Sequence, residues 1–309
     1  MQLSRSILLW MSENNFLKRE IPKLKFVQKA IRKFMPGETE HDALNEAANL
    51  LSEKIGITFT KLGENIIQIS EAENVKNHYL DLIELIKKKN LNIELSIKLT
   101  QLGFDLSEEK CFAFCNELAD SVKNKLGNTL FIDMEGSAYT QRTIDFYNKL
   151  KITNENVGLC LQAYLYRTET DLKNLLQENT KIRLVKGAYR EAKEIAFPKK
   201  IDVYKNYLEL SKILLQSIKE KNSRVIFGTH DEILIEKIIK EGKYLNLSKE
   251  KLEFQMLYGI KNNYIRNLVK RGYKGSILIA YGNSWYAWYM RRLAERPANI
   301  WFVLKNIFK

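Results

Sequence analysis

Residues 157–186 read VGLCLQAYLYRTETDLKNLLQENTKIRLVK, and this stretch contains a complete strand–helix–strand pattern. Two short apolar runs, Val157–Tyr164 and Ile182–Lys186, flank an amphipathic segment at Glu169–Glu178. Parallel neighbours in a sheet need a crossover connection, which is most often a helix. The stretch therefore predicts one unit of a parallel sheet whose faces are covered by helices.

The same alternation extends over most of the chain. Eight short runs are expected to form strands: Ile57–Lys61, Ile93–Thr100, Thr129–Met134, Val157–Tyr164, Ile182–Lys186, Arg224–Gly228, Leu252–Leu257 and Ser276–Ala280. Helices are expected between and after them: Val75–Lys88, Glu108–Lys125, Thr140–Lys151, Glu169–Glu178, Val203–Lys219, Glu232–Glu241, Tyr264–Arg271, Trp285–Glu295 and a last one near Ala298–Ile307. Eight such units predict a closed α/β barrel of the (β/α)8, TIM-like type. The competing open sheet would need a G-x-G-x-x-G turn to bind a dinucleotide, and no two glycines here are two residues apart.

The N-terminal part follows a different pattern. Apolar residues recur at helical spacing over residues 16–34, Pro36–Gly37 interrupts them, and a helical pattern resumes at Ala43–Ile55. The expected organisation is an N-terminal helical arm at residues 1–55, followed by a barrel catalytic domain with C-terminal helices at residues 56–309.

The charge of the chain limits its class. Fifty Lys and Arg residues against 37 Asp and Glu give a formal net charge of +13 over 309 residues. The lysines are spread over many segments, for example Lys87–Lys89, Lys199–Lys200 and Lys219–Lys221, which is typical of solvated helix faces. A nucleic-acid-binding protein gathers its positive charge in one patch or stripe. We therefore expect no nucleic acid partner, and keep a basic nucleic-acid-binding protein as the alternative from another class.

Cysteine usage and hydropathy predict a cytoplasmic protein. Three Cys without paired spacing are typical of a reducing compartment. The longest early apolar run, Ile7–Met11, is too short to span a bilayer and lacks the features of a signal peptide. The positive charge is compatible with peripheral contact at the inner face of a membrane.

Charged residues near strand ends are the first site candidates, because barrel enzymes build their active sites at the C-terminal ends of the strands. Alternation places Ser96, Lys98 and Thr100 on one face. If that face points inward, the Lys98 ammonium needs a partner or ligand; otherwise it snorkels to solvent. Asp133 ends the neighbouring strand, where it is expected either to pair with Lys98 in the cavity or to cap the next helix.

The fifth and sixth strands supply further candidates. Arg183 shares a face with Val185 and Gly187, and an arginine in a buried strand is hard to explain as a solvent-facing residue. Gly187 allows a flat cofactor or a phosphate to approach the backbone closely. The sixth strand is followed by Thr229 and His230, and this imidazole is either a structural residue or part of the site.

The expected helix Trp285–Glu295 is unusually aromatic and carries two adjacent arginines, Arg291 and Arg292. Neighbouring residues on a helix point about 100° apart, so both reach one ligand only if the helix crosses the mouth obliquely. Two guanidinium groups that converge on a carboxylate form an oriented clamp, which Glu295 is placed to support. The alternative is a basic pair on a helix surface. No His-Glu-x-x-His, Cys-x-x-Cys or carboxylate cluster is present, and no metal site is expected.

Seven stretches resemble the proline dehydrogenase family and occur in the family's order. They are Ser96–Thr100, Ile132–Glu135, Leu161–Leu165, Arg183–Tyr189, Thr229–His230, Glu253–Gly259 and Arg291–Glu295. The resemblance implies a distorted (β/α)8 barrel that binds FAD without a covalent link, as in the short monofunctional members. The implied reaction is oxidation of L-proline to Δ1-pyrroline-5-carboxylate by hydride transfer to flavin N5, with electrons passed to a membrane quinone in the first step of proline catabolism.

The resemblance also implies roles for the substrate site. Arg291 and Arg292 would bind the substrate carboxylate, and Lys98 would add a third positive contact. Glu295 would pair with the two arginines. Three cations matched to one carboxylate would hold the substrate in place for reaction, and orientation of this kind lowers the barrier.

For the flavin, the resemblance implies two catalytic side chains and a lining. Arg183 would lie by the N5–O4 edge, where a cation stabilises the electron-rich reduced ring. Asp133 would order the Arg and Lys side chains at the reacting face. The residues that would line the flavin are Met134, Gln162, Val185, Lys186, Gly187, Thr229 and His230.

Three positions depart from the family pattern in the walls of the substrate pocket. Leu278 stands where many members have a Tyr packed on the substrate ring, and Ala280 stands where a Pro is common. Trp288 replaces a second pocket Tyr. The expected substrate is proline, and hydroxyproline or another proline analogue is the alternative.

Overall fold

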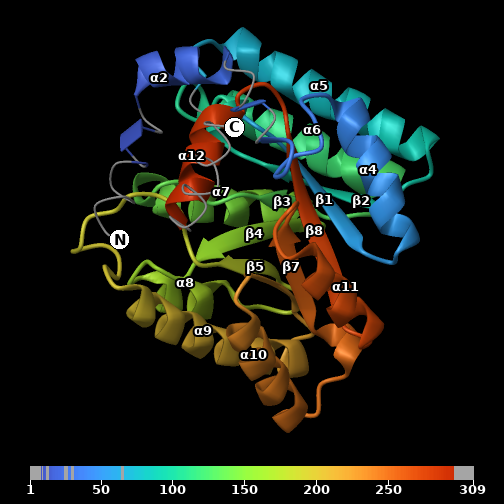
Figure 1. Cartoon of the computed structure of the whole chain (residues 1–309), viewed down its shortest axis with the longest axis vertical. Helices are drawn as coiled ribbons and strands as arrows, with labels where there is room; N and C mark the ends of the chain where they lie inside the picture. Colours follow the sequence, from blue (N-terminus) through green and yellow to red (C-terminus); the bar gives the residue numbers. More distant parts are fainter. Residues whose placement is uncertain are drawn as a thin grey trace, which may run out of the picture.

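The strands close into a barrel in the order of the sequence. In the computed structural model (Figure 1), β1 to β8 pair in parallel, each with the next, and β8 pairs with β1. This confirms the expected (β/α)8 barrel and excludes the open sheet. The structure describes residues 8, 10, 11, 14–23, 27, 28, 31–63 and 66–295.

Each expected strand overlaps one that is observed. Their bounds are β1 (Gly56–Lys61), β2 (Ile93–Ile97), β3 (Leu130–Ile132), β4 (Val157–Gln162), β5 (Lys181–Val185), β6 (Arg224–Gly228), β7 (Glu253–Leu257) and β8 (Lys274–Tyr281). β2 and β4 are buried along their whole length, as expected for strands covered on both faces.

Four strands, β2 to β5, end earlier than the residue pattern predicts, and β2 and β4 illustrate the reason. β2 stops at Ile97 because Thr100–Leu102 form a 3₁₀ turn, η2, which ends at Gly103 with a φ of 88°. β4 stops at Gln162, whose carbonyl accepts from the Leu165 amide at 3.3 Å in the following turn. Both turns are buried, and the residue pattern of each strand continues past its end, through Lys98–Thr100 after β2 and Ala163–Tyr164 after β4, so periodicity alone did not show where the strands end.

The described helices lie outside the barrel, with α5 and α6 on one side and α9 and α10 on another (Figure 1). Their bounds are α2 (Asn15–Glu20), α4 (Glu40–Ser52), α5 (Ile69–Lys88), α6 (Glu108–Leu126), α7 (Thr140–Thr153), α8 (Thr168–Leu175), α9 (Lys200–Glu220), α10 (Glu232–Tyr244), α11 (Asn262–Lys270) and α12 (Trp285–Glu295). The helix expected near Ala298–Ile307 lies outside the described residues. Within the described helices, none has both the length and the apolar content needed to cross a bilayer.

Helix α4 belongs to the core of the barrel, although it precedes residue 56, where the barrel domain was expected to begin. A capping box formed by Thr39 and Asp42 begins the helix, and its buried face lies against β1 and β8. The residues on that face are Ala43, Leu44, Ala47 and Leu50. Apolar residues before α4 do not join this core but pack against α12 in a second apolar cluster. They are Leu8, Val27, Ile31, Phe34 and Met35.

This second cluster lies at the carboxyl end of the barrel, where α12 follows β8 (Figure 1). Trp285 Nε1 donates to Glu38 Oε1 at 2.7 Å. In the loop after β7, a Cβ at Gly259 would overlap the carbonyl oxygen of Lys33, so only glycine fits under the arm. The described part of the arm therefore covers the end of the barrel at which sites of this fold form.

The opposite end of the barrel, where the strands begin, is closed by a group of polar and charged side chains. We call this group the floor cluster, and its members are Arg224, Glu94, Glu253 and Thr129. Arg224, at the start of β6, forms ion pairs with Glu94 of β2 and with Glu253 of β7, the latter at 2.9 Å. Both carboxylates are buried. Burial alone would lower the pKa of Arg224, but the two carboxylates outweigh it and raise the pKa above its ordinary value.

Candidate active site

An arginine lies inside the barrel in the middle of β5. Arg183 is only 2% exposed. Its Nη2 donates to Ser96 Oγ at 2.7 Å and pairs with Asp133, and its Nη1 donates to Gln255 Oε1 at 3.3 Å. Burial favours the neutral form of Arg183, but attraction to Asp133, together with smaller contributions from Cys160 and Glu94, outweighs it and raises the arginine's pKa above its ordinary value. The structure therefore holds a permanent positive charge within the barrel.

Asp133 pairs with Arg183, and the predicted ion pair with Lys98 is wrong. Ser96 Oγ donates to Asp133 Oδ1 at 2.8 Å, so one hydroxyl joins both members of the pair. The prediction compared only neighbouring strands, whereas the Arg183 side chain crosses the barrel from β5. Asp133 does not cap the next helix either, since neither η3 (Ser137–Tyr139) nor α7 has a side-chain cap. Its carboxylate is 18% exposed.

Lys98 lies just beyond the end of β2 and is 8% exposed. No described residue lies within hydrogen-bonding or ion-pairing distance of its Nζ. The segment is held in place by Glu135, which accepts from the Thr100 amide at 3.1 Å and from Thr100 Oγ1 at 2.6 Å. A buried ammonium without a partner is costly, so this position favours an anionic ligand.

Gln162 is the last residue of β4, and of its side-chain amide only the NH₂ group has a hydrogen-bond partner in the described structure. Its Nε2 donates to the Met134 carbonyl at 3.2 Å, which links the ends of β3 and β4. Its Oε1 is buried and has no hydrogen-bond donor in the described structure. An unsatisfied buried acceptor costs about 1–3 kcal/mol, so this oxygen is a candidate contact for a ligand N–H.

The loop after β5 begins with Lys186 and Gly187. Gly187 has a φ of 101°, and a Cβ there would overlap the ring of Tyr164. Packing within the chain thus already requires this glycine, whether or not a cofactor approaches it. Lys186 Nζ pairs with Asp231 at 3.0 Å. Burial raises the pKa of Asp231, but the Lys186 bond outweighs it and leaves the carboxyl pKa below its usual value.

Strand β6 is followed by two side chains with defined roles in the turn. Thr229 Oγ1 accepts from the Asp231 amide at 3.2 Å. His230 Nε2 accepts from the Leu257 amide at 3.0 Å, so its proton is on Nδ1 and the ring is neutral. The predicted lining residues Met134, Gln162, Val185, Lys186, Gly187, Thr229 and His230 therefore lie at or just after the carboxyl ends of four consecutive strands, β3 to β6.

Helix α12 lies against the loop after β5. The guanidinium carbon of Arg291 is 5.1 Å from the ring centre of Tyr189. This contact brings Arg291 to the same end of the barrel as Lys98 and Arg183. Arg292 and Glu295 belong to the same helix, but their side chains lie outside the described part of the structure, and their expected clamp with Arg291 stays a prediction.

Two further groups were not singled out from the sequence. Gln255 on β7 contacts Arg183, and the only signal for it was a polar residue inside an apolar strand. Glu191 accepts from the Ser137 amide at 2.8 Å and from the Tyr164 hydroxyl at 3.2 Å. It thereby ties the loop after β5 to the loops after β3 and β4, and nothing in the local sequence marks it.

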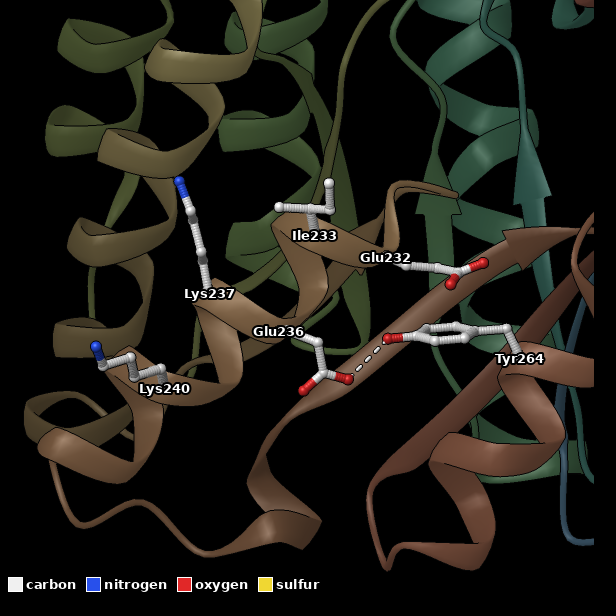
Figure 2. Close-up of a pocket in the computed structure, with 6 residues that line it drawn as sticks. All are labelled: Glu232, Ile233, Glu236, Lys237, Lys240 and Tyr264. Atoms are coloured by element: carbon white, nitrogen blue, oxygen red, sulfur yellow. Dashed lines mark hydrogen bonds between the residues drawn. The ribbon is translucent and has the colours of Figure 1, made fainter.

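A pocket of about 460 Å³ lies outside the barrel between α10 and α11 (Figure 2). Figure 2 shows the Tyr264 hydroxyl directed at Glu236, to which it donates at 2.8 Å, while Lys237 and Lys240 extend away from it. Glu236 also pairs with Arg271, and Glu232 pairs with Lys261. Both carboxylates are therefore satisfied within the protein, and the charge pattern that favours a ligand lies at the barrel mouth.

Comparison with known proteins leads to the same family as the sequence resemblance. The family model described as proline dehydrogenase matches residues 43–305. Proline dehydrogenase 2 of Bacillus subtilis subsp. natto is 34% identical over 310 residues, which is 100% of both chains. Proline dehydrogenase 1 of Bacillus subtilis (strain 168) is 34% identical over 308 residues, 99% of both chains. Proline dehydrogenase of Deinococcus radiodurans is 32% identical over 281 residues, covering 90% of this chain and 89% of that protein.

Solved structures support the fold. Proline utilization A from Bdellovibrio bacteriovorus, inactivated by N-propargylglycine, aligns with a TM-score of 0.80 at 23% identity. The alignment covers 94% of this chain and 38% of that longer chain. The barrel and the matches to proline dehydrogenases together define the class, a (β/α)8-barrel oxidoreductase, and its candidate cationic site lies at the carboxyl ends of the strands. Within that class, the chain belongs to the proline dehydrogenase family.

Proposed function

We propose that the protein oxidises L-proline to Δ1-pyrroline-5-carboxylate, using FAD held without a covalent link at the barrel mouth. Membership of the proline dehydrogenase family supports the activity. The observation that carries the site assignment is Lys98, a buried cation to which no residue in the described part of the chain is paired. It lies two residues beyond Ser96, whose hydroxyl contacts both Arg183 and Asp133.

The described residues fit a flavin. The buried Gln162 Oε1 has no donor in the described structure, and the flavin ring offers an imide N–H. Arg183 would supply a fixed positive charge beside the ring, and its pairing with Asp133 keeps that charge in place. When bound, the flavin accepts the hydride from the substrate carbon next to nitrogen and passes the electrons to a quinone. Because the flavin supplies the redox chemistry, the protein needs no nucleophile and no metal.

Binding of the substrate carboxylate is assigned to Lys98, Arg291 and Arg292. The contact with the Tyr189 ring limits the movement of the Arg291 guanidinium, which favours a directed pair with a carboxylate. Glu295 is assigned to support the two arginines. Three cations around one carboxylate would fix the ring of the substrate relative to the flavin, and this positioning is the protein's main contribution to the rate.

The pocket walls favour proline over its hydroxylated analogue. Ser276 points into the barrel, and Leu278 and Ala280 follow it on the same face of β8. Neither side chain offers a hydrogen-bond partner to a substrate hydroxyl, and Trp288 is 9% exposed in the apolar cluster of α12. An apolar wall disfavours a buried hydroxyl, though by no more than about a hundredfold.

Transfer of electrons to a membrane quinone requires contact with the bilayer surface. The arm exposes Trp10 and Phe16, which are 54% and 62% exposed, and the chain carries a net charge of +13. Exposed aromatic side chains and positive charge are what a peripheral protein presents to anionic lipid. We therefore place the protein at the inner face of the membrane. Co-sedimentation with anionic vesicles should be weakened by Trp10→Ala, and equal binding of the variant would contradict this placement.

An absorption spectrum of the purified protein tests the proposal. The expected protein is yellow, and anaerobic addition of proline bleaches it faster than the same concentration of trans-4-hydroxyproline. A clear preference for hydroxyproline would change the assigned substrate. A colourless protein that binds nucleic acid with strongly salt-dependent affinity would contradict the flavoenzyme altogether.

A further inference from the structure

Gln255 lies in the middle of β7 with its amide inside the barrel. It is 4% exposed, and it contacts three other strands. Its Nε2 donates to Thr58 Oγ1 on β1 at 3.0 Å and to Ser276 Oγ on β8 at 3.2 Å. Its Oε1 accepts from Arg183 Nη1 on β5 at 3.3 Å. The amide is thus held on both sides by buried partners.

These bonds determine which way the amide points. Both N–H groups of Gln255 are used by hydroxyl oxygens, so the carbonyl oxygen faces the guanidinium. The reversed amide would place an NH₂ group against another donor and leave Arg183 Nη1 without an acceptor. An unsatisfied donor on a buried charged group is strongly unfavourable. Thr58 and Ser276 therefore orient Gln255, and Gln255 in turn contacts Arg183.

Arg183 needs such a second contact to hold one orientation. Its Nη2 is fixed by Ser96 and Asp133, and Cys160 adds a contact to the guanidinium, but these partners leave the Nη1 side to be held by another acceptor. Gln255 fixes the other nitrogen from the opposite side of the barrel. The Phe131 ring adds a third restraint, 5.0 Å from the guanidinium carbon. Together these contacts define the plane of the guanidinium group.

We propose that Gln255 is a positioning residue that sets the orientation of the Arg183 guanidinium for the redox reaction. It touches neither the substrate nor the cofactor in this assignment, and acts only through Arg183. The inference rests on the proposed role of Arg183 beside the flavin. A displaced guanidinium would stabilise the reduced flavin less well, although the substrate carboxylate would still be bound by other residues.

The test uses Gln255→Leu, with Asn156→Leu as the matched control. Asn156 is also a buried amide whose Nδ2 makes two hydrogen bonds, at 2.9 and 3.2 Å, but it lies before β4 at the other end of the barrel. Gln255→Leu should reduce flavin about tenfold more slowly at saturating proline, with the proline concentration for half-maximal rate little changed. Its bound flavin should also have a lower reduction potential than that of the wild type.

The control separates positioning from stability. Asn156→Leu should lower the melting temperature while leaving the flavin potential and the reduction rate at wild-type values. If Gln255→Leu shows the same pattern as Asn156→Leu, the positioning role is wrong. Should Gln255→Leu fail to fold, Ser276→Ala removes one of the two bonds that orient the amide, and it should shift the flavin potential in the same direction but by less. An unchanged potential in Ser276→Ala would likewise overturn the proposal.

Gln255→Glu gives a readout that a packing role does not predict. The protonated acid can still accept from Arg183 Nη1, whereas the ionised form competes with Asp133 for the guanidinium. The reduction rate of this variant should therefore fall as pH rises through the new group's pKa, in a range where the wild type has no such step. A pH profile identical to wild type would contradict the proposal.

Arg183→Leu, measured alongside, separates this inference from the proposed function. If Arg183→Leu reduces its flavin at the wild-type rate, the role assigned to Arg183 fails. If it is strongly impaired while the Gln255 variants match the wild type, only the positioning role of Gln255 fails.

Discussion

Each end of the barrel contains an arginine that is paired with carboxylates, but the two ends balance its charge differently. At the floor, Arg224 has two carboxylate partners, Glu94 and Glu253. At the mouth, Arg183 has one carboxylate partner, and Lys98 nearby has none among the described residues. The floor thus carries an excess of negative charge and the mouth an excess of positive charge. A cluster that closes a barrel satisfies its cations, whereas a binding site leaves a cation for its ligand.

Phe131 lies between the two ends. Its ring centre is 5.0 Å from the guanidinium carbon of Arg183 and 5.8 Å from that of Arg224. Glu94 and Ser96 are two residues apart on β2, so the two layers are about 7 Å apart along the strand. A Cβ at Gly158 would overlap the Phe131 ring, which explains the glycine inside β4. The Phe131 ring therefore lies between the floor arginine and the mouth arginine.

Loss of the floor arginine should have the largest effect on stability. Arg224→Leu leaves Glu94 and Glu253 buried without a cation, and breaking a buried pair in this way costs about 3–5 kcal/mol. We expect a large fall in the free energy of unfolding at neutral pH, measured by urea denaturation, with partial recovery in mild acid as the carboxylates take up protons. A variant as stable as the wild type would show that the floor cluster does not hold the barrel closed.

At the mouth, the corresponding change should affect function and spare the fold. Lys98→Met removes a buried charge that no described residue pairs with, so its melting temperature should equal or exceed that of the wild type. Proline binding should weaken about ten- to a hundredfold, as expected for loss of a charged hydrogen bond, and the flavin should be retained. Steady-state kinetics and flavin content measure the two effects. Loss of flavin with unchanged proline affinity would assign Lys98 to the cofactor instead.

Glu94→Gln tests whether the floor needs both of its carboxylates. Burial raises the pKa of Glu94, although Arg224 opposes the shift. When a carboxyl has a raised pKa in the folded state, the free energy of unfolding decreases as the pH rises from the ordinary pKa, 4.5, to the raised pKa. The amide avoids this loss, so we expect Glu94→Gln to lie within about 1 kcal/mol of wild type at neutral pH and to be relatively less stable in acid. A large loss at neutral pH would mean that the ionised Glu94 is required.

His78 provides the smallest expected effect and lies outside both clusters. It shares a 2.9 Å hydrogen bond with the Tyr281 hydroxyl at the end of β8. Burial, followed by the nearby Lys61, lowers its pKa below the ordinary 6.5. The unfolded chain therefore binds a proton first, and stability falls as pH drops through 6.5 towards the lowered value. His78→Gln should remove about 0.5 kcal/mol or less of this acid sensitivity, because the ring is partly exposed and screened. Thermal unfolding at several pH values measures it.

The sequence predicts the architecture well because strand and helix periodicity are local properties. The alternation from Ile57 onwards was enough for a closed barrel, and the observed bounds of β6 match the expected Arg224–Gly228. Local patterns failed where the chain turns within a buried region, as at Thr100–Leu102. There the alternation of apolar and polar residues continues past Ile97 as far as Thr100, so the pattern gave no boundary.

The sequence predicted which residues lie at the carboxyl end of the barrel, but the residue pattern did not predict which of them contact one another. Arg183 and Asp133 were both expected at the cavity, and the resemblance implied that Asp133 orders an arginine there, but the residue pattern alone did not give this pair because it depends on reach across the barrel. Gln255 had a visible signal, a polar residue in an apolar strand, but its contacts come from three other strands. Such groups are found only once the register of the whole barrel is known.

The contact between Glu38 and Trp285 has a consequence for biosynthesis. These residues are 247 positions apart in the chain, and the arm and α12 form one apolar cluster. A ribosome therefore releases the arm long before its partner helix exists. During that interval the apolar face of the arm is exposed on the nascent chain, where aggregation or a chaperone competes for it. Arg291, which α12 carries, reaches its place only after the last strand has closed the barrel.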